Sequence, residues 1–234
     1  MLPVKLGIFS MTPPAAPDDD GSYLRWHLLD HMPEQFSLPG IVQAHRWLAD
    51  APLRSARIAG DGPLADLGGL VEYYVAEPVS ATLDDFFALA GRLREAGRFP
   101  EVRPSLGLRM LALQQWYAAP QALASAEVVP YRPHRGILLL VEEPGGEVDD
   151  QVADMLEVPG VAGAGVYRGP GPWTIPAPAA GPDLVFTVVY LDADPLTTTA
   201  ALTPLVEQRW ASGTLRPLFA GPLRSMVEWE AWPS

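Results

Sequence analysis

The architecture of this chain follows from YLRWHLLDHMPEQFSLPGIVQAHRW, the stretch that runs from Tyr23 to Trp47. Its first part has the pattern of a helix, and Pro33 is expected to end that helix because proline disfavours helical geometry in the residue before it. The turn residues Leu38-Pro39-Gly40 then lead into a strand over Ile41–Leu48. The stretch therefore predicts a helix that returns through a tight turn into a β-strand.

Three of the four histidines of the chain, His27, His31 and His45, lie in this stretch. A shorter echo of the turn and strand, VPGVAGAGVYR, occurs at Val158–Arg168 and contains no histidine. The two copies therefore indicate a repeated structural unit in which one copy is polar and the other is not.

The predicted elements recur in the same order in both halves of the chain. The first half is expected to contain strands at 2–11, 41–48, 70–76 and 108–117 and helices at 23–32 and 83–96. The second half is expected to contain strands at 135–142, 161–168, 184–191 and 223–232 and helices at 149–157 and 197–210. Three dipeptides of the first half (Pro-Gly, Leu-Val and Leu-Arg) recur in the second half at offsets of 114 to 120 residues. We predict an α+β protein with two tandem β-α-β-β-α-β repeats, in residues 1–120 and 135–234, joined by a linker over 121–134.

The composition excludes several classes of function. Hydrophobic residues make up 48% of the 234 residues, which is typical of a globular protein. The net charge of −12 speaks against a nucleic-acid partner, and the absence of cysteine excludes disulfides and thiolate chemistry. Neither a signal peptide nor an apolar run long enough to span a bilayer is present, so a cytoplasmic protein without a membrane partner is expected.

Each predicted repeat has one sheet face that its own helices leave bare. Two such bare faces can bury each other, which predicts that the two repeats form one closed α/β barrel. A chain of this kind is a pseudo-dimer, and we expect either a monomer or a homodimer.

The sequence resembles the dimeric α/β-barrel superfamily and, within it, the EthD-like branch. The resemblance rests on Trp26 followed by Asp30-His31-Met32-Pro33-Glu34, and on the turn Leu38-Pro39-Gly40. Two departures are visible: the double histidine frequent in the family is Asp30-His31 here, and the second half lacks the motif. The resemblance implies a small-molecule site in a cleft, and relatives that include monooxygenases, cyclases, isomerases, dehydratases, decarboxylases and haem proteins.

The two-residue period of strands assigns side chains to opposite sheet faces. Aliphatic residues such as Val42, Leu111 and Leu113 are expected on the helix-covered face. The barrel interior is then expected to receive Gln43, His45, Trp47, Glu72, Tyr74, Gln114 and Trp116. The corresponding positions of the second half are Gly163, Gly165, Phe186 and Val188, so we predict one asymmetric pocket with open space opposite His45.

Two histidines are candidates for moving a proton, because imidazole titrates near physiological pH. His31 is the first candidate and His45 the second; a hydrogen bond at the helix end or a buried core position are the structural alternatives. His27 precedes His31 by four residues, but no HExxH motif is present and metal binding is not expected. His134 is expected to be solvated in the linker.

We predict a small-molecule enzyme that performs acid–base chemistry without a cofactor, such as a dehydratase, decarboxylase, cyclase or isomerase, on an aromatic or polyketide-like substrate. A cofactor-independent monooxygenase and a non-catalytic ligand-binding protein are the alternatives, and haem binding is a further one. The expected substrate-binding residues are Tyr23, Trp26, His27, Gln43, Trp47, Glu72, Tyr74, Gln114, Trp116, Gly163, Gly165 and Phe186.

Overall fold

The structure is a computed structural model that describes residues 3–14, 21–60, 62–100, 105–145, 152–169, 171–175, 179 and 181–226. The elements of its first half are β1 (Val4–Thr12), α1 (Ser22–Trp26), the π-helical segment η1 (His27–His31), α2 (Met32–Gln35), β2 (Ile41–Leu48), α3 (Ala51–Ser55), β3 (Ala59–Gly60), η2 (Gly62–Leu64), β4 (Gly69–Ala76), α4 (Val79–Glu95) and β5 (Gly107–Ala118). The connection contains the short 3₁₀ turns η3 (Pro120–Ala122) and η4 (Val129–Tyr131). The second half contains β6 (Gly136–Pro144), α5 (Ala153–Leu156), β7 (Val161–Arg168), β8 (Val185–Leu191), α6 (Pro195–Ala211) and β9 (Leu215–Ser225).

One antiparallel sheet connects all the strands in the order β2-β4-β1-β5-β7-β8-β6-β9-β3, and an additional pairing between β2 and β9 closes it into a barrel. Within each half the second strand of the repeat pairs with the third, the third with the first, and the first with the fourth. β5 pairs with β7 at one junction of the halves, and β2 pairs with β9 at the other. The predicted fold class is confirmed.

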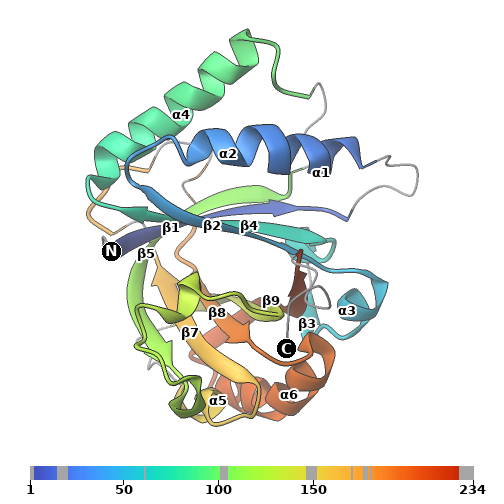
Figure 1. Ribbon diagram of the computed structural model, residues 1–234. Helices are drawn as coiled ribbons and strands as arrows, with labels where there is room; N and C mark the ends of the chain where they lie inside the picture. Colours follow the sequence, from blue (N-terminus) through green and yellow to red (C-terminus); the bar gives the residue numbers. More distant parts are fainter. Residues whose placement is uncertain are drawn as a thin grey trace.

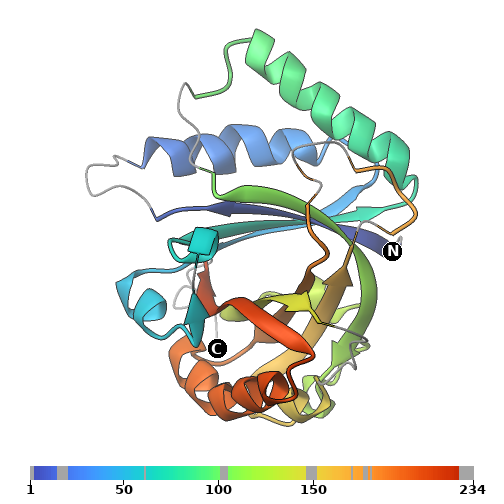
Figure 2. The same cartoon turned by 180° about the vertical axis from the view of Figure 1, so that it is seen from behind.

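The helices lie on the outside of the barrel. Figure 1 shows α1, α2 and α4 over the sheet of the first half, and α5 and α6 over the sheet of the second half on the opposite side. Seen from behind, the connection between β7 and β8 rises toward the helices of the first half (Figure 2). Trp173, Ile175 and Ala179 of that connection pack against the first half's helix–sheet core, so the second half contributes to this layer.

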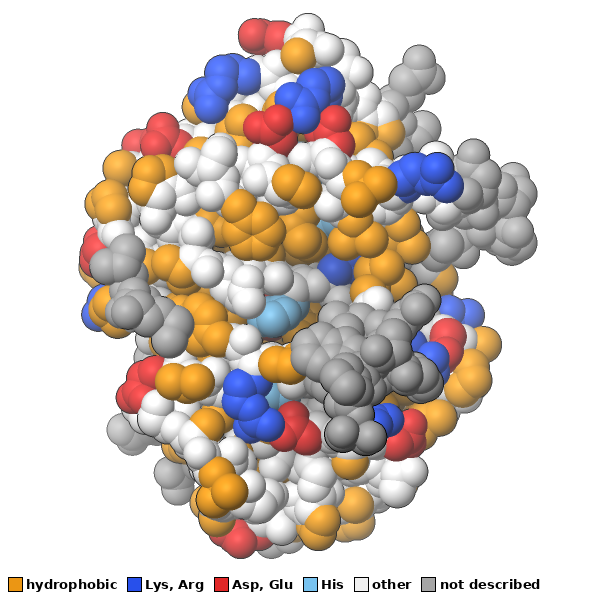
Figure 3. Space-filling view, viewed as in Figure 1, with side chains coloured by type: hydrophobic (Ala, Val, Ile, Leu, Met, Phe, Trp, Pro, Cys, Tyr) orange, Lys and Arg blue, Asp and Glu red, His pale blue; other side chains and the backbone are white. Residues whose placement is uncertain are grey.

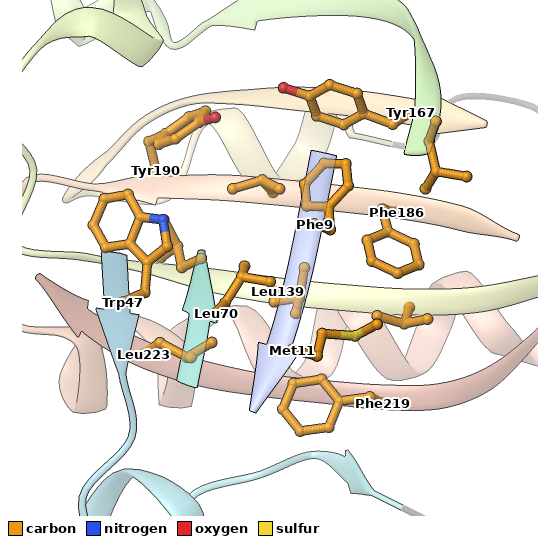
Figure 4. Close-up of a cluster of buried hydrophobic side chains, with 14 of the residues drawn as sticks. Phe9, Met11, Trp47, Leu70, Leu139, Tyr167, Phe186, Tyr190, Phe219 and Leu223 are labelled. Carbon is orange, nitrogen blue, oxygen red and sulfur yellow. The ribbon is translucent and has the colours of Figure 1, made fainter. Parts of the chain in front are cut away.

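Apolar and aromatic side chains fill the barrel interior. Phe9, Met11, Trp47, Tyr167 and Phe186 converge from strands of both halves, as Figure 4 shows, and each is at most 3% exposed. Burial of this surface is the main stabilising contribution that joins the two sheets.

The two Pro-Gly turns are needed for close approach to the next helix. A Cβ on Gly40 would lie 1.9 Å from Oγ1 of Thr82 in α4, and a Cβ on Gly160 would lie 2.6 Å from Cβ of Ala193. Gly160 also has a φ of +93°, a conformation that side chains strongly disfavour. These glycines are thus packing requirements in both halves.

Several predicted boundaries change. The first helix does not end at Met32 but continues to Gln35, with Pro33 in the turn that follows the π-helical segment. The wider π turn accommodates the proline ring, which would clash with the carbonyl four residues earlier in a regular α-helix. The last strand begins at Leu215 rather than Leu223, so the two Leu-Arg dipeptides do not occupy equivalent positions in β5 and β9. Residues 227–232 of the predicted strand and 149–151 of the predicted helix lie outside the described residues.

Two helices, α3 and α6, begin at an aspartate that caps the helix N-terminus, a residue type that is preferred at this position. Asp50 accepts a hydrogen bond from the Leu53 amide at 3.1 Å at the start of α3, an element that the sequence did not predict. Asp194 accepts one from the Thr197 amide at 2.9 Å, and Pro195 occupies the first turn of α6. No helix of the described part is both long enough and apolar enough to cross a bilayer.

Candidate functional site

A row of buried and half-buried polar side chains lies between the α1–η1–α2 helical segment and the outer face of the first-half sheet. We call this group the polar layer; its members are Tyr23, His27, His31, Gln35, Arg46 and Tyr73. On the face shown in Figure 3, a basic side chain and a histidine side chain lie recessed among hydrophobic side chains over the strands of the first half.

The π-helical segment places three members of the polar layer on one face. His27, His31 and Gln35 follow each other at four-residue intervals and are 4%, 5% and 0% exposed. A π-helical turn holds more residues than an α-helical turn, so a four-residue spacing stays on the sheet-facing side. Segments of this kind are rare and occur frequently at functional sites.

Aromatic rings enclose His31. Its ring stacks on Trp26 with centroids 4.7 Å apart, and Phe99 meets it edge-on at 5.1 Å. His27 lies 5.6 Å away and contacts Tyr23 as well. The four predicted residues Tyr23, Trp26, His27 and His31 are thus brought together by the structure.

Arg46 reaches the polar layer from β2. It is 7% exposed, and its guanidinium carbon lies 5.3 Å from the centroid of the Tyr23 ring. Burial lowers the pKa of Arg46, while interactions with Tyr23 and Tyr73 act in the opposite direction. Among the described residues its Nε and Nη1 have no hydrogen-bond partner, and no carboxylate forms an ion pair with it.

Gln35 is the second member of the polar layer with unmet hydrogen-bonding capacity. Its side chain is fully buried, and neither the amide oxygen nor the amide nitrogen has a partner within the described part of the chain. A buried polar group without a partner costs about 1–3 kcal/mol. Gln35 and Arg46 therefore offer a donor–acceptor amide and a cation that a polar ligand or water would satisfy.

Ion pairs fasten the helical segment to the chain beyond α4. Arg98 donates to Asp30 at 2.9 Å and to Glu34 at 2.6 Å, and the Trp26 indole donates to the Arg98 carbonyl at 2.7 Å. These contacts lie on the exposed side of the segment, opposite the polar layer, and hold its histidines against the sheet.

A second polar group, separate from the polar layer, lies inside the barrel around Glu72. Its carboxylate accepts hydrogen bonds from Tyr190 at 3.1 Å, Tyr167 at 3.3 Å and the Trp47 indole at 3.4 Å. The Tyr74 and Tyr190 hydroxyls are 2.7 Å apart. Burial raises the pKa of Glu72 to about 7 even though these hydrogen bonds favour the charged form.

His45 lies at the side of this group and links the halves. Its Nε2 is 2.8 Å from the carbonyl oxygen of Pro130 in the connection, and its ring contacts Trp47 and Tyr74. Because a carbonyl can only accept, Nε2 carries the proton. Burial lowers the pKa of His45 to about 4, so the ring is a weak base. His134, expected to be solvated, is in fact buried between Asp192 and the Val129 carbonyl, at 2.7 Å from each.

The expected open space opposite His45 is filled. A Cβ on Gly165 would lie 2.2 Å from the Trp116 ring, and a Cβ on Gly163 would lie 2.2 Å from the Tyr117 carbonyl oxygen. The second-half glycines therefore admit a tryptophan and a neighbouring backbone instead of creating a cavity.

Two irregularities in the strands explain the wrong face assignments. The pairing of β5 shifts between Leu113 and Gln115, so Leu111 faces the barrel and Gln114 instead donates to the carbonyls of Ala112 and Arg168. The pairing of β2 shifts between Ile41 and Gln43, and the Gln43 amide oxygen accepts from the Ala44 amide. A β-bulge reverses the alternation that the face prediction assumed.

Sequence reasoning missed three members of the polar layer: Gln35, Arg46 and Tyr73. Gln35 was detectable, because it continues the four-residue spacing of His27 and His31. Arg46 and Tyr73 lie on strands whose outer face was expected to be aliphatic.

The comparisons with known proteins concern the fold. No family model and no curated protein matches the sequence. Among solved structures, an anthrone oxidase-like protein superposes with a TM-score of 0.55 and 13% identity, over 95% of this chain and 92% of that one. The fold is also similar to that of a putative chlorite dismutase, with a TM-score of 0.56 and 10% identity over 96% of this chain and 95% of that one. A putative monooxygenase from Fusobacterium nucleatum superposes with a TM-score of 0.55 and 8% identity over 97% of this chain and 94% of that one. The chain has the α/β-barrel fold of these proteins.

These neighbours overturn the prediction that no cofactor is involved. A putative chlorite dismutase has this fold, and haem proteins are among the relatives that the family resemblance implies, so the fold gives no support for a cofactor-free protein. A haem iron held by histidine needs an imidazole that faces open space. His31 lies between Trp26 and Phe99, and His45 and His134 are hydrogen-bonded to carbonyls. His27 is 4% exposed and packs against aromatic rings, so the four histidines do not fit such a haem. The described residues contain no group of three or more metal-ligating side chains.

Proposed function

We propose that this chain is a small-molecule enzyme of the oxidase or monooxygenase kind, of the EthD-like branch, with its site in the polar layer. The observation that carries the proposal is the set of buried polar atoms without a hydrogen-bond partner among the described residues, Nε and Nη1 of Arg46 and the amide of Gln35. They lie toward the two ends of the helical segment that carries the two buried histidines. The fold shared with an anthrone oxidase-like protein and a putative monooxygenase supports the same class of reaction.

The roles follow from the chemistry of each side chain. His31 takes a proton from an activated carbon or a phenol of the substrate, since imidazole is the side chain best suited to this transfer near neutral pH. Arg46 stabilises the resulting oxyanion, and Gln35 hydrogen-bonds a carbonyl or hydroxyl group. The Trp26 and Phe99 rings provide the apolar walls that suit a flat aromatic molecule.

The proposed reaction uses molecular oxygen as the second substrate. Deprotonation of a CH₂ group that is conjugated through aromatic rings with a ketone gives an aryloxide-type enolate, and this carbanion adds O₂ at the former CH₂ carbon. The proton held on His31 passes to the resulting peroxide. Loss of the second C–H proton then breaks the O–O bond and gives the carbonyl and one water, so the four electrons lost by carbon reduce one O₂.

Anthrone is a suitable test substrate, because oxidation of its CH₂ group gives a quinone that absorbs at a longer wavelength. We expect quinone formation with one O₂ consumed per product, and no product without oxygen. His31→Gln should lower kcat by about 100- to 10,000-fold, and Arg46→Met should lower kcat/KM by about 100-fold or more. His45→Gln is the matched control and should keep activity, since its histidine is hydrogen-bonded to Pro130 in another part of the molecule.

Other outcomes assign other functions. Turnover of a related hydroxylated or carboxylated substrate that is unaffected by removing oxygen would indicate a dehydratase, decarboxylase, cyclase or isomerase. Binding without turnover, unchanged in His31→Gln, would indicate a ligand-binding protein. Equal loss of activity in His45→Gln and His31→Gln would contradict the placement of the site in the polar layer.

A further inference from the structure

A cavity of about 400 Å³ opens at one end of the barrel, away from the polar layer. It lies where β1 ends and where β5, β8 and β9 begin. Its apolar wall includes Met11, Leu106, Leu184, Phe186 and Leu218. This volume falls within the range of about 300–1,000 Å³ that is usual for small-molecule sites.

The floor of this barrel-mouth cavity is rigid and separates it from Glu72. Phe186 packs on Phe9 with ring centroids 5.0 Å apart, and Phe9 meets Tyr167 edge-on at 4.8 Å. Pro182 and Pro217 stand at the rim, where their fixed φ restricts the backbone. The cavity therefore has a preformed aromatic floor and a stiff rim.

One cation at the wall of the cavity, Arg109, has no carboxylate partner in the part of the chain that the structure describes. Arg109 lies directly opposite Phe9 in the β1–β5 pairing, which places both side chains on the barrel side. Its Nη1 donates to the Leu108 carbonyl at 2.8 Å, whereas its buried Nε has no partner among the described residues. A Cβ on Gly181 would lie 2.9 Å from this Nε, so the glycine allows the guanidinium to sit against the loop.

The other charges at the mouth neutralise each other. Arg216 donates to Glu143 through Nε and Nη2, so that pair contributes little net charge. Among the described residues that line the cavity, Arg109 is the cation left to attract an anion. Guanidinium groups recognise carboxylates through two parallel hydrogen bonds.

We propose that the barrel-mouth cavity is a binding site for a small apolar carboxylic acid. The acid's hydrocarbon or aromatic body would lie on Met11, Phe186 and Leu218, and its carboxylate would bond to Arg109. This site is independent of the polar layer and of the reaction proposed there.

Calorimetric titration with 2-naphthoate, compared with the neutral 2-naphthamide, tests the proposal. We expect one naphthoate per chain, bound more tightly than the amide. Arg109→Met keeps most of the apolar stem and removes the charge; it should weaken naphthoate binding by about 10- to 100-fold and abolish the preference for the acid. Leu218→Trp, which fills the cavity, should weaken both ligands.

Arg92→Met is the control, because it removes an exposed arginine of α4 that belongs neither to the cavity nor to the polar layer. It should leave naphthoate affinity within about twofold. The proposal is overturned if the wild type does not bind naphthoate, if Arg109→Met keeps the preference, or if Arg46→Met removes it, because the aromatic acid would then occupy the polar layer. If Arg109→Met does not fold, Leu218→Trp and Arg109→Lys decide, since the lysine variant should keep part of the preference for the acid.

Discussion

The two halves of the barrel share one strand order but differ in whether their buried arginine and glutamate side chains pair with each other. In the second half, Arg209 (1% exposed) donates to both oxygens of Glu142 at 2.9 Å, and the Trp210 indole donates to the same carboxylate at 2.7 Å. In the first half, among the described residues, Arg46 lies between the helix and the sheet without a carboxylate partner, and Glu72 lies inside the barrel without a cation.

Neighbouring positions on the strands keep the first-half charges apart. Glu72 pairs with His45 and Val71 pairs with Arg46, so the acid and the cation project from opposite faces of the same sheet. An arginine and a glutamate that face each other form a structural ion pair, as in the second half. The same two residue types on opposite faces leave a cation without an ion pair among the described residues and a carboxyl group with a raised pKa. The asymmetry between the halves thus lies in where their charges point.

The largest effect is expected from breaking the second-half ion pair. Arg209→Met leaves Glu142 buried without its cation and should lower the free energy of unfolding by about 3–5 kcal/mol. Urea denaturation measures this loss of free energy. The comparison variant is Arg46→Met, which leaves no carboxylate without its cation and should change the free energy of unfolding by no more than about 1 kcal/mol. Similar losses in the two variants would contradict the contrast between the halves.

The next effect concerns the unpaired carboxyl of the first half. The pKa of Glu72 rises from 4.5 to about 7 on folding, so the folded state binds the proton more tightly and stability falls as pH rises through this interval. Glu72→Gln should therefore be more stable than the wild type by up to about 3 kcal/mol above pH 8, and equal to it near pH 4.5. Thermal unfolding across this range measures the difference; a difference independent of pH would contradict the assignment.

A smaller effect is expected at the unpartnered amide. Gln35→Met keeps the length of the side chain and removes both polar atoms, so it should raise the free energy of unfolding by about 1 kcal/mol. The same variant should reduce turnover of the test substrate, because the amide is proposed to bind it. Gain of stability together with unchanged turnover would assign Gln35 to the structure alone.

The smallest effect is expected at His45, which is only half-buried. Its pKa falls from 6.5 to about 4 on folding, so the unfolded state binds the proton more tightly. The free energy of unfolding therefore decreases as pH falls from 6.5 toward 4. His45→Gln retains a donor for the Pro130 carbonyl and should lose less stability than the wild type between pH 7 and pH 5. Parallel melting curves for the two proteins would show that this histidine does not titrate in the expected range.

Local patterns were sufficient for the fold. Pro-Gly turns, alternating strands and the amphipathic α4 each depend on nearby residues, and Gly40 and Gly160 proved to be required where the repeat placed them. The four-residue spacing of His27 and His31 was considered only for metal binding, and extending it by one more interval reaches Gln35, which is buried on the same side. Site residues on strands were predicted less well, because the bulges in β2 and β5 reverse the alternation and no local signal marks them.

The sequence by itself determined the order of elements, the barrel and the cluster around His31, since these follow from periodicity and turn chemistry within short segments. Only the tertiary structure decided which charges meet. Arg209 finds Glu142 across 67 residues, whereas Arg46 and Glu72 are separated by the thickness of a sheet. Trp116 fills the space that Gly165 leaves, which no pattern within either strand reveals. Packing and electrostatics depend on distances between segments remote in the chain, and these distances exist only in the folded protein.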